Sequence, residues 1–167
     1  MRPLPVLLPL LLLLALPGRA APVPTATVLG VESGDVLRVR LADRIRRIRL
    51  ACVDAPEPLQ QPWADEARQA LERALPVGTA VTVDLRARDV YDRIVAVVRR
   101  GGDDVAAGQL RAGRVFLLEG YLGRCDDLPY RSIEQEARNR ALGVWEVPGG
   151  LERPWDLRNR LDDPGEP

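Results

Sequence analysis

The chain has 167 residues, and its 24 basic and 24 acidic side chains give a formal net charge of zero, which at first speaks against a nucleic-acid partner. All of the basic residues are arginine, and the absence of lysine and histidine excludes histidine-based triads, histidine-ligated zinc and Schiff-base lysines. The chemistry that remains must come from carboxylates, arginines, hydroxyls, two cysteines or an ion bound through oxygen.

Residues 1–20 have the pattern of a secretory signal peptide. Arg2 precedes an apolar run over 4–16, and small residues lead to Ala20, after which we expect cleavage. The alternative is an uncleaved N-terminal membrane anchor, which Pro5 and Pro9 disfavour because proline interrupts a helix. The sequence therefore predicts an exported protein, periplasmic or secreted, with no stable membrane association once processed.

A short linker at 21–24 leads into a domain that we place at 25–147. Its first part predicts three strands, at 25–31, 36–41 and 45–53. In the second of these, apolar residues alternate with Arg38 and Arg40, which is typical of a strand with one buried face.

A helix is expected next, beginning at Pro62 and ending before Pro76. The pattern then predicts strands at 81–85 and 94–98 and helices at 105–112 and 130–142. Five short strands with about three helices indicate an α+β fold, namely a five-stranded oligonucleotide/oligosaccharide-binding (OB) barrel with helices packed on it. The remaining residues, 148–167, are expected to form a surface or disordered tail, because they are rich in proline, arginine and aspartate.

The two cysteines, Cys52 and Cys125, are compatible with one disulfide across a long loop in an exported protein. A buried free thiol at Cys52 is an equal alternative, because that residue lies within an apolar strand pattern.

Three segments place polar residues where a strand pattern does not require them. Residues 33–35 (Ser-Gly-Asp) follow the first strand and are, by themselves, an ordinary turn. Asp54 and Glu57 flank a proline, and two carboxylates so close repel each other unless a cation such as calcium, or an arginine in a solvated loop, offsets their charge. Residues 89–93 (Asp-Val-Tyr-Asp-Arg) precede the fifth strand and are compatible with a charged hairpin.

Together these segments resemble the staphylococcal nuclease-like (thermonuclease) family, from about Thr25 to Arg158. The family's Asp-Gly-Asp-Thr turn corresponds to 33–36, its Arg-Leu-x-x-x-Asp-x-Pro-Glu signature to 49–57, and its Asp-x-Tyr-Gly-Arg turn to 89–93. Gly-Val-Trp at 143–145 and Pro-Trp-Asp-Leu-Arg at 154–158 look like the end of bacterial members. Each motif is weak alone, but their combination in this order is specific.

The resemblance implies a Ca²⁺-dependent endonuclease. Asp35, Asp54 and the backbone carbonyl of Ala55 would hold the calcium ion. Glu57 would position or deprotonate the attacking water. The resemblance also implies that such a protein acts on single-stranded DNA and RNA, cleaving the 5′ P–O bond and leaving 3′-phosphates, and we expect a monomer.

Arginines and tyrosines complete the implied site. Arg49 and Arg93 would stabilise the phosphoryl oxygens, a task that suits the planar guanidinium. Tyr91 matches a tyrosine that contacts the terminal phosphate in the family, and Tyr121 is the one obvious match to the tyrosines that meet the base.

The sequence departs from the family pattern at Ser33, Val36 and Asp92, where the family has aspartate, threonine and glycine. The first change predicts weaker calcium binding, and the third adds a negative charge near the phosphate. The alternative function is a non-catalytic OB module that binds single-stranded nucleic acid or a protein partner.

Overall fold

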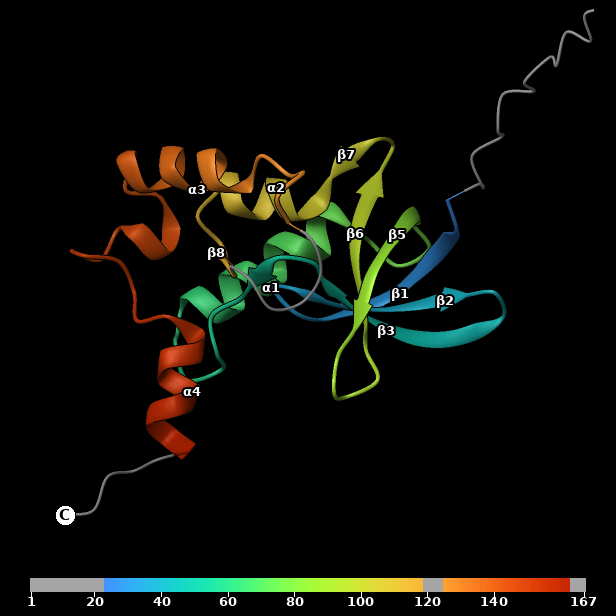
Figure 1. Ribbon diagram of the computed structural model, residues 1–167, viewed down its shortest axis with the longest axis horizontal. Coiled ribbons are helices and arrows are strands. Elements are labelled where there is room, and N and C mark those ends of the chain that lie inside the picture. Colours follow the sequence, from blue (N-terminus) through green and yellow to red (C-terminus); the bar gives the residue numbers. More distant parts are fainter. Residues whose placement is uncertain (1–22, 119–124, 163–167) are drawn as a thin grey trace, which may run out of the picture.

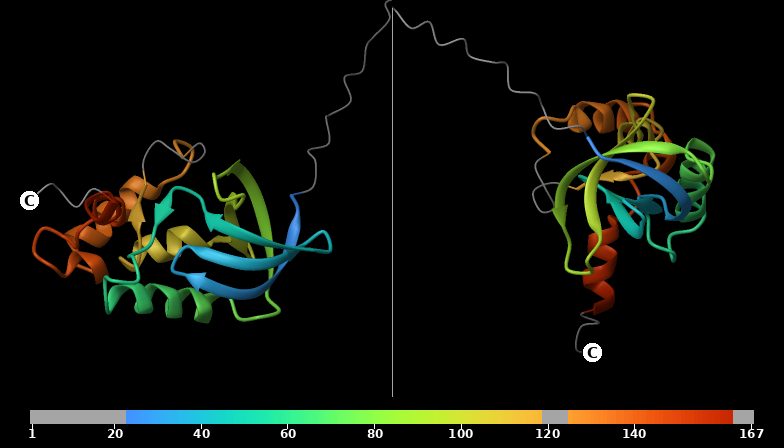
Figure 2. Two further views of the ribbon diagram at one scale, coloured as in Figure 1. Left: turned by 90° about the horizontal axis from the view of Figure 1, so that it is seen from below. Right: turned by 90° about the vertical axis from the view of Figure 1, so that its right-hand side faces the viewer.

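The five long strands that the hydrophobic pattern predicts are present in the computed structural model, which describes residues 23–118 and 125–162. They are β1 (Thr25–Ser33), β2 (Val36–Leu41), β3 (Arg44–Leu50), β5 (Ala80–Arg88) and β6 (Ile94–Arg100). The sheet order is β3-β2-β1-β5-β6, and a parallel pairing of β3 with β6 closes it into a mixed five-stranded barrel, shown in Figures 1 and 2. The predicted OB-type barrel is confirmed.

The third strand ends earlier than the predicted range 45–53. It stops at Leu50, and Cys52 adopts a positive φ of 64°, a left-handed conformation that turns the chain out of the sheet. The next two residues form β4 (Val53–Asp54), which pairs with β8 (Phe116–Leu117) in a separate small sheet. This corner moves Asp54 out of the barrel wall.

Helices gather at the side of the barrel that lies away from the tip of the β2–β3 hairpin (Figure 1). They are α1 (Trp63–Ala74), α2 (Val105–Arg111) and α3 (Tyr130–Asn139), followed by a 3-10 turn, η1 (Gly143–Trp145). A two-residue strand, β7 (Asp103–Asp104), leads into α2, and the Asp104 carboxylate caps that helix by accepting from the Ala107 N–H at 3.0 Å. The predicted helices are thus all present.

The C-terminal segment differs from the expected tail, because residues 154–162 form a further helix, α4 (Pro154–Asp162). Its Pro154 and Leu157 are buried, and Trp155 packs edge-on against Phe116 with 6.4 Å between the ring centroids. The sequence does not reveal this helix because so few of its residues are apolar. Contacts with the rest of the domain stabilise a helix that would be marginal alone.

The barrel interior and a smaller cluster form the core. Inward residues of the strands pack with Leu71 of α1, Leu110 of α2 and Ile133 of α3. The smaller cluster joins Phe116 to Trp145 at the base of α4. Within the described residues, no helix is long and apolar enough to cross a membrane. The predicted signal peptide at 1–20 and Tyr121 both lie outside the described residues.

Candidate active site

A cleft of about 600 Å³ opens where the β1–β2 turn, β4, the β5–β6 turn and α4 meet. Its lining includes most of the residues that the sequence marks as functional: Asp35, Arg49, Asp54, Ala55, Glu57, Tyr91 and Arg93. These residues come from three segments that are far apart in the chain. The fold therefore brings together all of the predicted site residues that it describes.

The β1–β2 turn presents Asp35 at the floor of the cleft. The residue is 5% exposed, and its Oδ1 accepts a hydrogen bond from the Ser33 hydroxyl at 2.7 Å. Gly34 allows the turn to approach α1 closely, because a Cβ at this position would lie 2.5 Å from the Ala67 Cβ. The buried amide of Gln109 donates to the carbonyls of both Gly34 and Ala67, at 3.0 and 2.9 Å, and so ties the turn to the helix.

Arg49 lies between two buried carboxylates. It stands opposite Val36 in the β2–β3 register, and only 6% of it is exposed. Its Nη2 donates to Asp54 Oδ1 at 2.9 Å, and its Nε lies 3.4 Å from Asp35 Oδ2. One guanidinium thus contacts both of the carboxylates that are predicted to bind calcium.

The electrostatics of the cleft favour a cation. Burial raises the pKa of Asp35 above its usual value, and the nearby charge of Asp54 raises it further, while Arg49 and the Ser33 hydroxyl oppose the change. A raised pKa means that the surroundings disfavour the negative charge of this carboxylate. An additional positive charge beside Asp35 would therefore stabilise the ionised form.

A buried glutamine braces the loop that carries Glu57. The backbone N–H of Glu57 donates to Gln60 Oε1 at 2.8 Å, and the side-chain amide of Gln60 donates to the Glu152 carbonyl at 2.7 Å. Glu57 itself is half-buried at the edge of the cleft. Gln60 and Gln109 position the site, and sequence reasoning missed both, because an isolated glutamine carries no pattern.

The β5–β6 turn presents Arg93 and Tyr91. The Asp89 carboxylate accepts from the backbone N–H groups of both residues and from Arg93 Nε. Burial alone would raise the pKa of Asp89, but these hydrogen bonds outweigh it and hold the pKa below its usual value. The Arg93 guanidinium also lies 5.2 Å from the centre of the Tyr91 ring, which is otherwise exposed.

Asp92, which stands where the family has glycine, adopts the left-handed conformation with φ of 57°. Its side chain is 83% exposed and pairs with Arg88 at 3.1 Å. Asp92 is not among the residues that line the cleft. Its charge is therefore partly offset and turned towards solvent.

Arg158 of α4 is a further cationic residue of the cleft, which sequence reasoning assigned no role. Its Nη2 donates to Asp54 Oδ2 at 2.6 Å, and its Nη1 donates to Glu57 Oε1. Burial alone would lower the pKa of Arg158, but its contacts with the two carboxylates raise it, so the guanidinium keeps its charge. The Pro-Trp-Asp-Leu-Arg motif could have marked this arginine as functional, but only the tertiary structure shows that it contacts Asp54 and Glu57.

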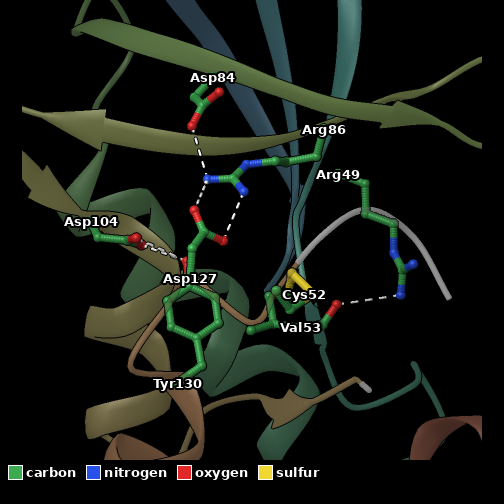
Figure 3. Close-up of a disulfide and its surroundings, with 9 residues drawn as sticks. Arg49, Cys52, Val53, Asp84, Arg86, Asp104, Asp127 and Tyr130 are labelled. Carbon is green, nitrogen blue, oxygen red and sulfur yellow. Dashed lines mark hydrogen bonds and ion pairs between the residues drawn. A yellow bond between two sulfur atoms is a disulfide. The ribbon is translucent and has the colours of Figure 1, made fainter. Parts of the chain in front are cut away.

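Cys52 and Cys125 form a disulfide, with 5.9 Å between their Cα atoms, as drawn in Figure 3. The bond fastens the corner between β3 and β4 to the segment before α3. Beside it, Arg86 pairs with Asp127 at 2.9 Å on the same segment (Figure 3). The disulfide holds the chain that leads to Asp54 against the segment before α3, and the ion pair joins β5 to that same segment.

The donors available for a metal ion are few. In the parts of the chain that the structure describes, no group of three or more Asp, Glu, Cys or His side chains is arranged to hold a metal. Asp35 and Asp54 are hard oxygen donors that line one cleft together with Ala55, and calcium accepts carbonyl and water oxygens as well as carboxylates. This donor chemistry fits calcium and does not fit zinc.

Comparison with known proteins identifies the family. The model of the staphylococcal nuclease homologue family matches residues 47–147. A protein named ParB from Escherichia coli is 30% identical over 81% of this chain and 82% of its own length. An uncharacterized endonuclease from the same species is 32% identical over 80% of this chain and 84% of its own length.

Fungal relatives are longer. A protein named probable endonuclease LCL3 from Schizophyllum commune is 33% identical over 78% of this chain, which spans 52% of that relative. The matched segment in this chain contains Arg49, Asp54, Glu57 and Arg93, so the cleft lies mainly inside the region shared with the family. The chain therefore belongs to the staphylococcal nuclease homologue family, and the relatives named as endonucleases support a nuclease function for it.

Proposed function

We propose that this protein is an exported, Ca²⁺-dependent endonuclease that hydrolyses single-stranded DNA and RNA at the 5′ P–O bond and leaves 3′-phosphates. The observation that carries the proposal is the arrangement of Asp35, Asp54 and Glu57 with Arg49 and Arg93 in one cleft. A protein that only bound nucleic acid would have no need for a half-buried glutamate beside two buried aspartates.

Asp35, Asp54 and the Ala55 carbonyl would hold the metal ion. When bound, a calcium ion supplies positive charge that draws the substrate phosphate into the cleft and offsets the charge that develops on it. The raised pKa of Asp35 supports this assignment, since burial and then the charge of Asp54 disfavour its ionised form, which a bound cation would stabilise.

Glu57 would act on the attacking water. Its carboxylate accepts a proton from the water, whose oxygen forms a bond to phosphorus while the bond from phosphorus to the 5′ oxygen breaks. The leaving 5′ oxygen takes up a proton from solvent. Arg93 stands at the rim with its Nε held by Asp89, and this leaves its terminal nitrogens to donate to the phosphoryl oxygens. Arg49 contacts the two aspartates, and with Arg93 it would stabilise the phosphoryl oxygens as negative charge develops.

Tyr91 would contact the terminal phosphate. Its side chain is exposed at the rim of the cleft, next to the Arg93 guanidinium. A hydroxyl in that position can donate to a phosphate oxygen. Tyr121 remains a proposed contact to the base and lies outside the described residues.

The outer face of the β2–β3 hairpin supports a polyanionic substrate despite the net charge of zero. Arg38 stands directly opposite Arg47, and Arg40 is the next outward residue of β2. Because side chains alternate along a strand, these arginines share a face with Arg49 and lead away from the cleft. Like charges that face each other are unfavourable in a sheet, so an anionic ligand along this face would relieve the repulsion. Glu32 offsets part of it by pairing with Arg47 at 2.6 Å.

Export is supported by the signal-like pattern of residues 1–20 and by the disulfide, since disulfides persist in oxidising compartments. Processing after Ala20 would release the protein to the periplasm or the medium. Detection of the mature N-terminus by mass spectrometry in the exported fraction tests this part. Retention of the full-length chain in the membrane fraction would indicate the uncleaved anchor instead.

The central experiment is incubation of the purified mature protein with single-stranded DNA and RNA, with calcium or with a chelator. We expect calcium-dependent cleavage, 3′-phosphate ends, and a loss of activity of at least about 100-fold in Glu57→Gln, within the range for removal of a general base. Glu72→Gln is the control, because Glu72 is an exposed residue of α1 paired with Arg68 and remote from the cleft. If the protein shifts single strands in a salt-dependent manner but never cleaves them, it is the binding module.

A further inference from the structure

The C-terminal helix α4 reaches into the cleft through a single arginine. Arg158 donates one hydrogen bond to Asp54 and one to Glu57, across more than 100 residues of sequence. The family match ends at residue 147, whereas α4 begins at Pro154. The residue that reaches two of the proposed functional carboxylates therefore lies beyond the segment matched by the family model, in the motif at 154–158 that resembles the end of bacterial members.

The helix that carries Arg158 is anchored to the domain at several points. Pro154 and Leu157 are buried, and Glu152, just before α4, accepts from the Gln60 amide through its carbonyl. Trp155 lines the same cleft as Glu57. The packing of α4 against the domain therefore places Arg158 next to the two carboxylates.

Asp54 is enclosed by two guanidiniums, one on each carboxylate oxygen. Arg49 donates to Oδ1 at 2.9 Å and Arg158 to Oδ2 at 2.6 Å. The two arginines differ in exposure: 8% of the Arg49 side chain is exposed, compared with 42% of the Arg158 side chain. Arg158 can therefore leave Asp54 for solvent at low cost, whereas Arg49 cannot.

We propose that Arg158 is the resident counter-ion of the metal site and that a divalent cation competes with it for Asp54, so that Arg158 also releases Glu57. This inference rests on the proposed function. Asp54 and Glu57 form a pair of negative charges that needs a cation, and Arg158 supplies one in the metal-free protein. A divalent cation at Asp54 would repel the guanidinium at such short range, so each cation weakens the hold of the other. Metal loading thus frees Glu57 from its arginine and leaves Arg158 available to the substrate phosphate.

The first test is the affinity for calcium measured by isothermal titration calorimetry without substrate. We expect Arg158→Gln to bind calcium about five- to tenfold more tightly than the wild type, because a partly exposed competing charge is removed. Arg158→Lys, which keeps the charge without the two-pronged geometry, should lie between them. The control is Arg160→Gln on the same helix, because Arg160 pairs with Glu152 and not with the cleft. Its affinity should equal that of the wild type.

The second test compares melting temperatures with and without saturating calcium. Competition predicts that Arg158→Gln lowers the melting temperature of the calcium-free protein but leaves the calcium-loaded protein nearly unchanged. A purely structural role for Arg158 would lower both values equally. The rise in melting temperature on adding calcium should therefore be larger in Arg158→Gln than in the wild type, because calcium no longer has to displace the guanidinium from Asp54.

The outcomes separate this inference from the proposed function. Calcium binding that is unchanged or weaker in Arg158→Gln overturns the competition and leaves the nuclease proposal intact. Calcium binding by neither protein overturns both. Binding that is detectable only in Arg158→Gln supports the competition in its strongest form.

Discussion

Gly34→Ala tests whether the close approach between the β1–β2 turn and α1 positions the site. A Cβ at residue 34 would lie 2.5 Å from the Ala67 Cβ, 3.0 Å from the Ala55 Cβ and 3.3 Å from the Ala67 carbonyl carbon. None of these atoms can rotate away, because alanine has no side-chain torsion that moves its Cβ. The turn or the helix must therefore move by about 1 Å to reach ordinary contact distances, and such overpacking costs about 1–3 kcal/mol.

The free-energy cost translates into a measurable loss of thermal stability. For a domain of this size, about 2 kcal/mol lowers the melting temperature by roughly 4–8 °C. The effect on activity should be larger, because Asp35 is the next residue and Ala55 is a predicted ligand on the other side of the contact. A displacement of about 1 Å near a reacting centre can reduce the rate about 100-fold.

The assay combines thermal denaturation with calcium-dependent cleavage of single-stranded DNA. Gly30→Ala is the matched control, because a Cβ there would meet only Arg38 Nη2, at 3.7 Å. The double variant Gly34→Ala/Ala67→Gly removes the shortest contact and should recover part of both losses. If Gly34→Ala behaves like Gly30→Ala in both measurements, the close approach of the β1–β2 turn to α1 affects neither stability nor activity, and the prediction is refuted.

Three further predictions follow from the turn, the disulfide and the arginine face. Asp89→Asn should lower the free energy of unfolding by about 1.5–3 kcal/mol at pH 7, since the ion pair with Arg93 Nε is lost and the two backbone N–H groups no longer donate to a charged oxygen. The pKa of Asp89 is lowered in the folded state, so its contribution to stability is fully present above the unfolded-state pKa of about 3.9 and disappears as the pH falls through the folded-state value. The urea denaturation curves of the variant and the wild type should therefore converge in acid. Replacing both cysteines by alanine should cost about 2–4 kcal/mol, since the bridge closes a separation of 73 residues; equal denaturation midpoints for the variant and the oxidised wild type would contradict this. Arg38→Gln/Arg47→Gln should reduce the salt dependence of single-strand binding, measured in the Glu57→Gln background. The slope of log binding constant against log salt concentration should fall by about 0.7 for each phosphate that the variant no longer neutralises, whereas Arg73→Gln on α1 should leave it unchanged.

The local pattern determined the strands and most of the helices. Alternation along β2 and β5 requires one buried face, and Pro62 with the apolar face containing Ala67 and Leu71 requires α1. The motifs also located the segments that meet at the cleft, because each of them is a short turn whose residues are neighbours in the chain. In these segments the local interactions and the final fold agree.

The tertiary structure alone decided which groups meet. Whether Cys52 reaches Cys125, whether Asp35 lies beside Asp54, and whether Arg158 reaches Glu57 all depend on barrel closure and on the packing of α4. Such contacts join residues far apart in sequence, and no periodicity encodes them. For the same reason, the net charge of zero says little about phosphate binding, because strand register places Arg38, Arg40 and Arg47 on one face of the sheet. Composition gives the number of charged residues, whereas the fold determines where they lie.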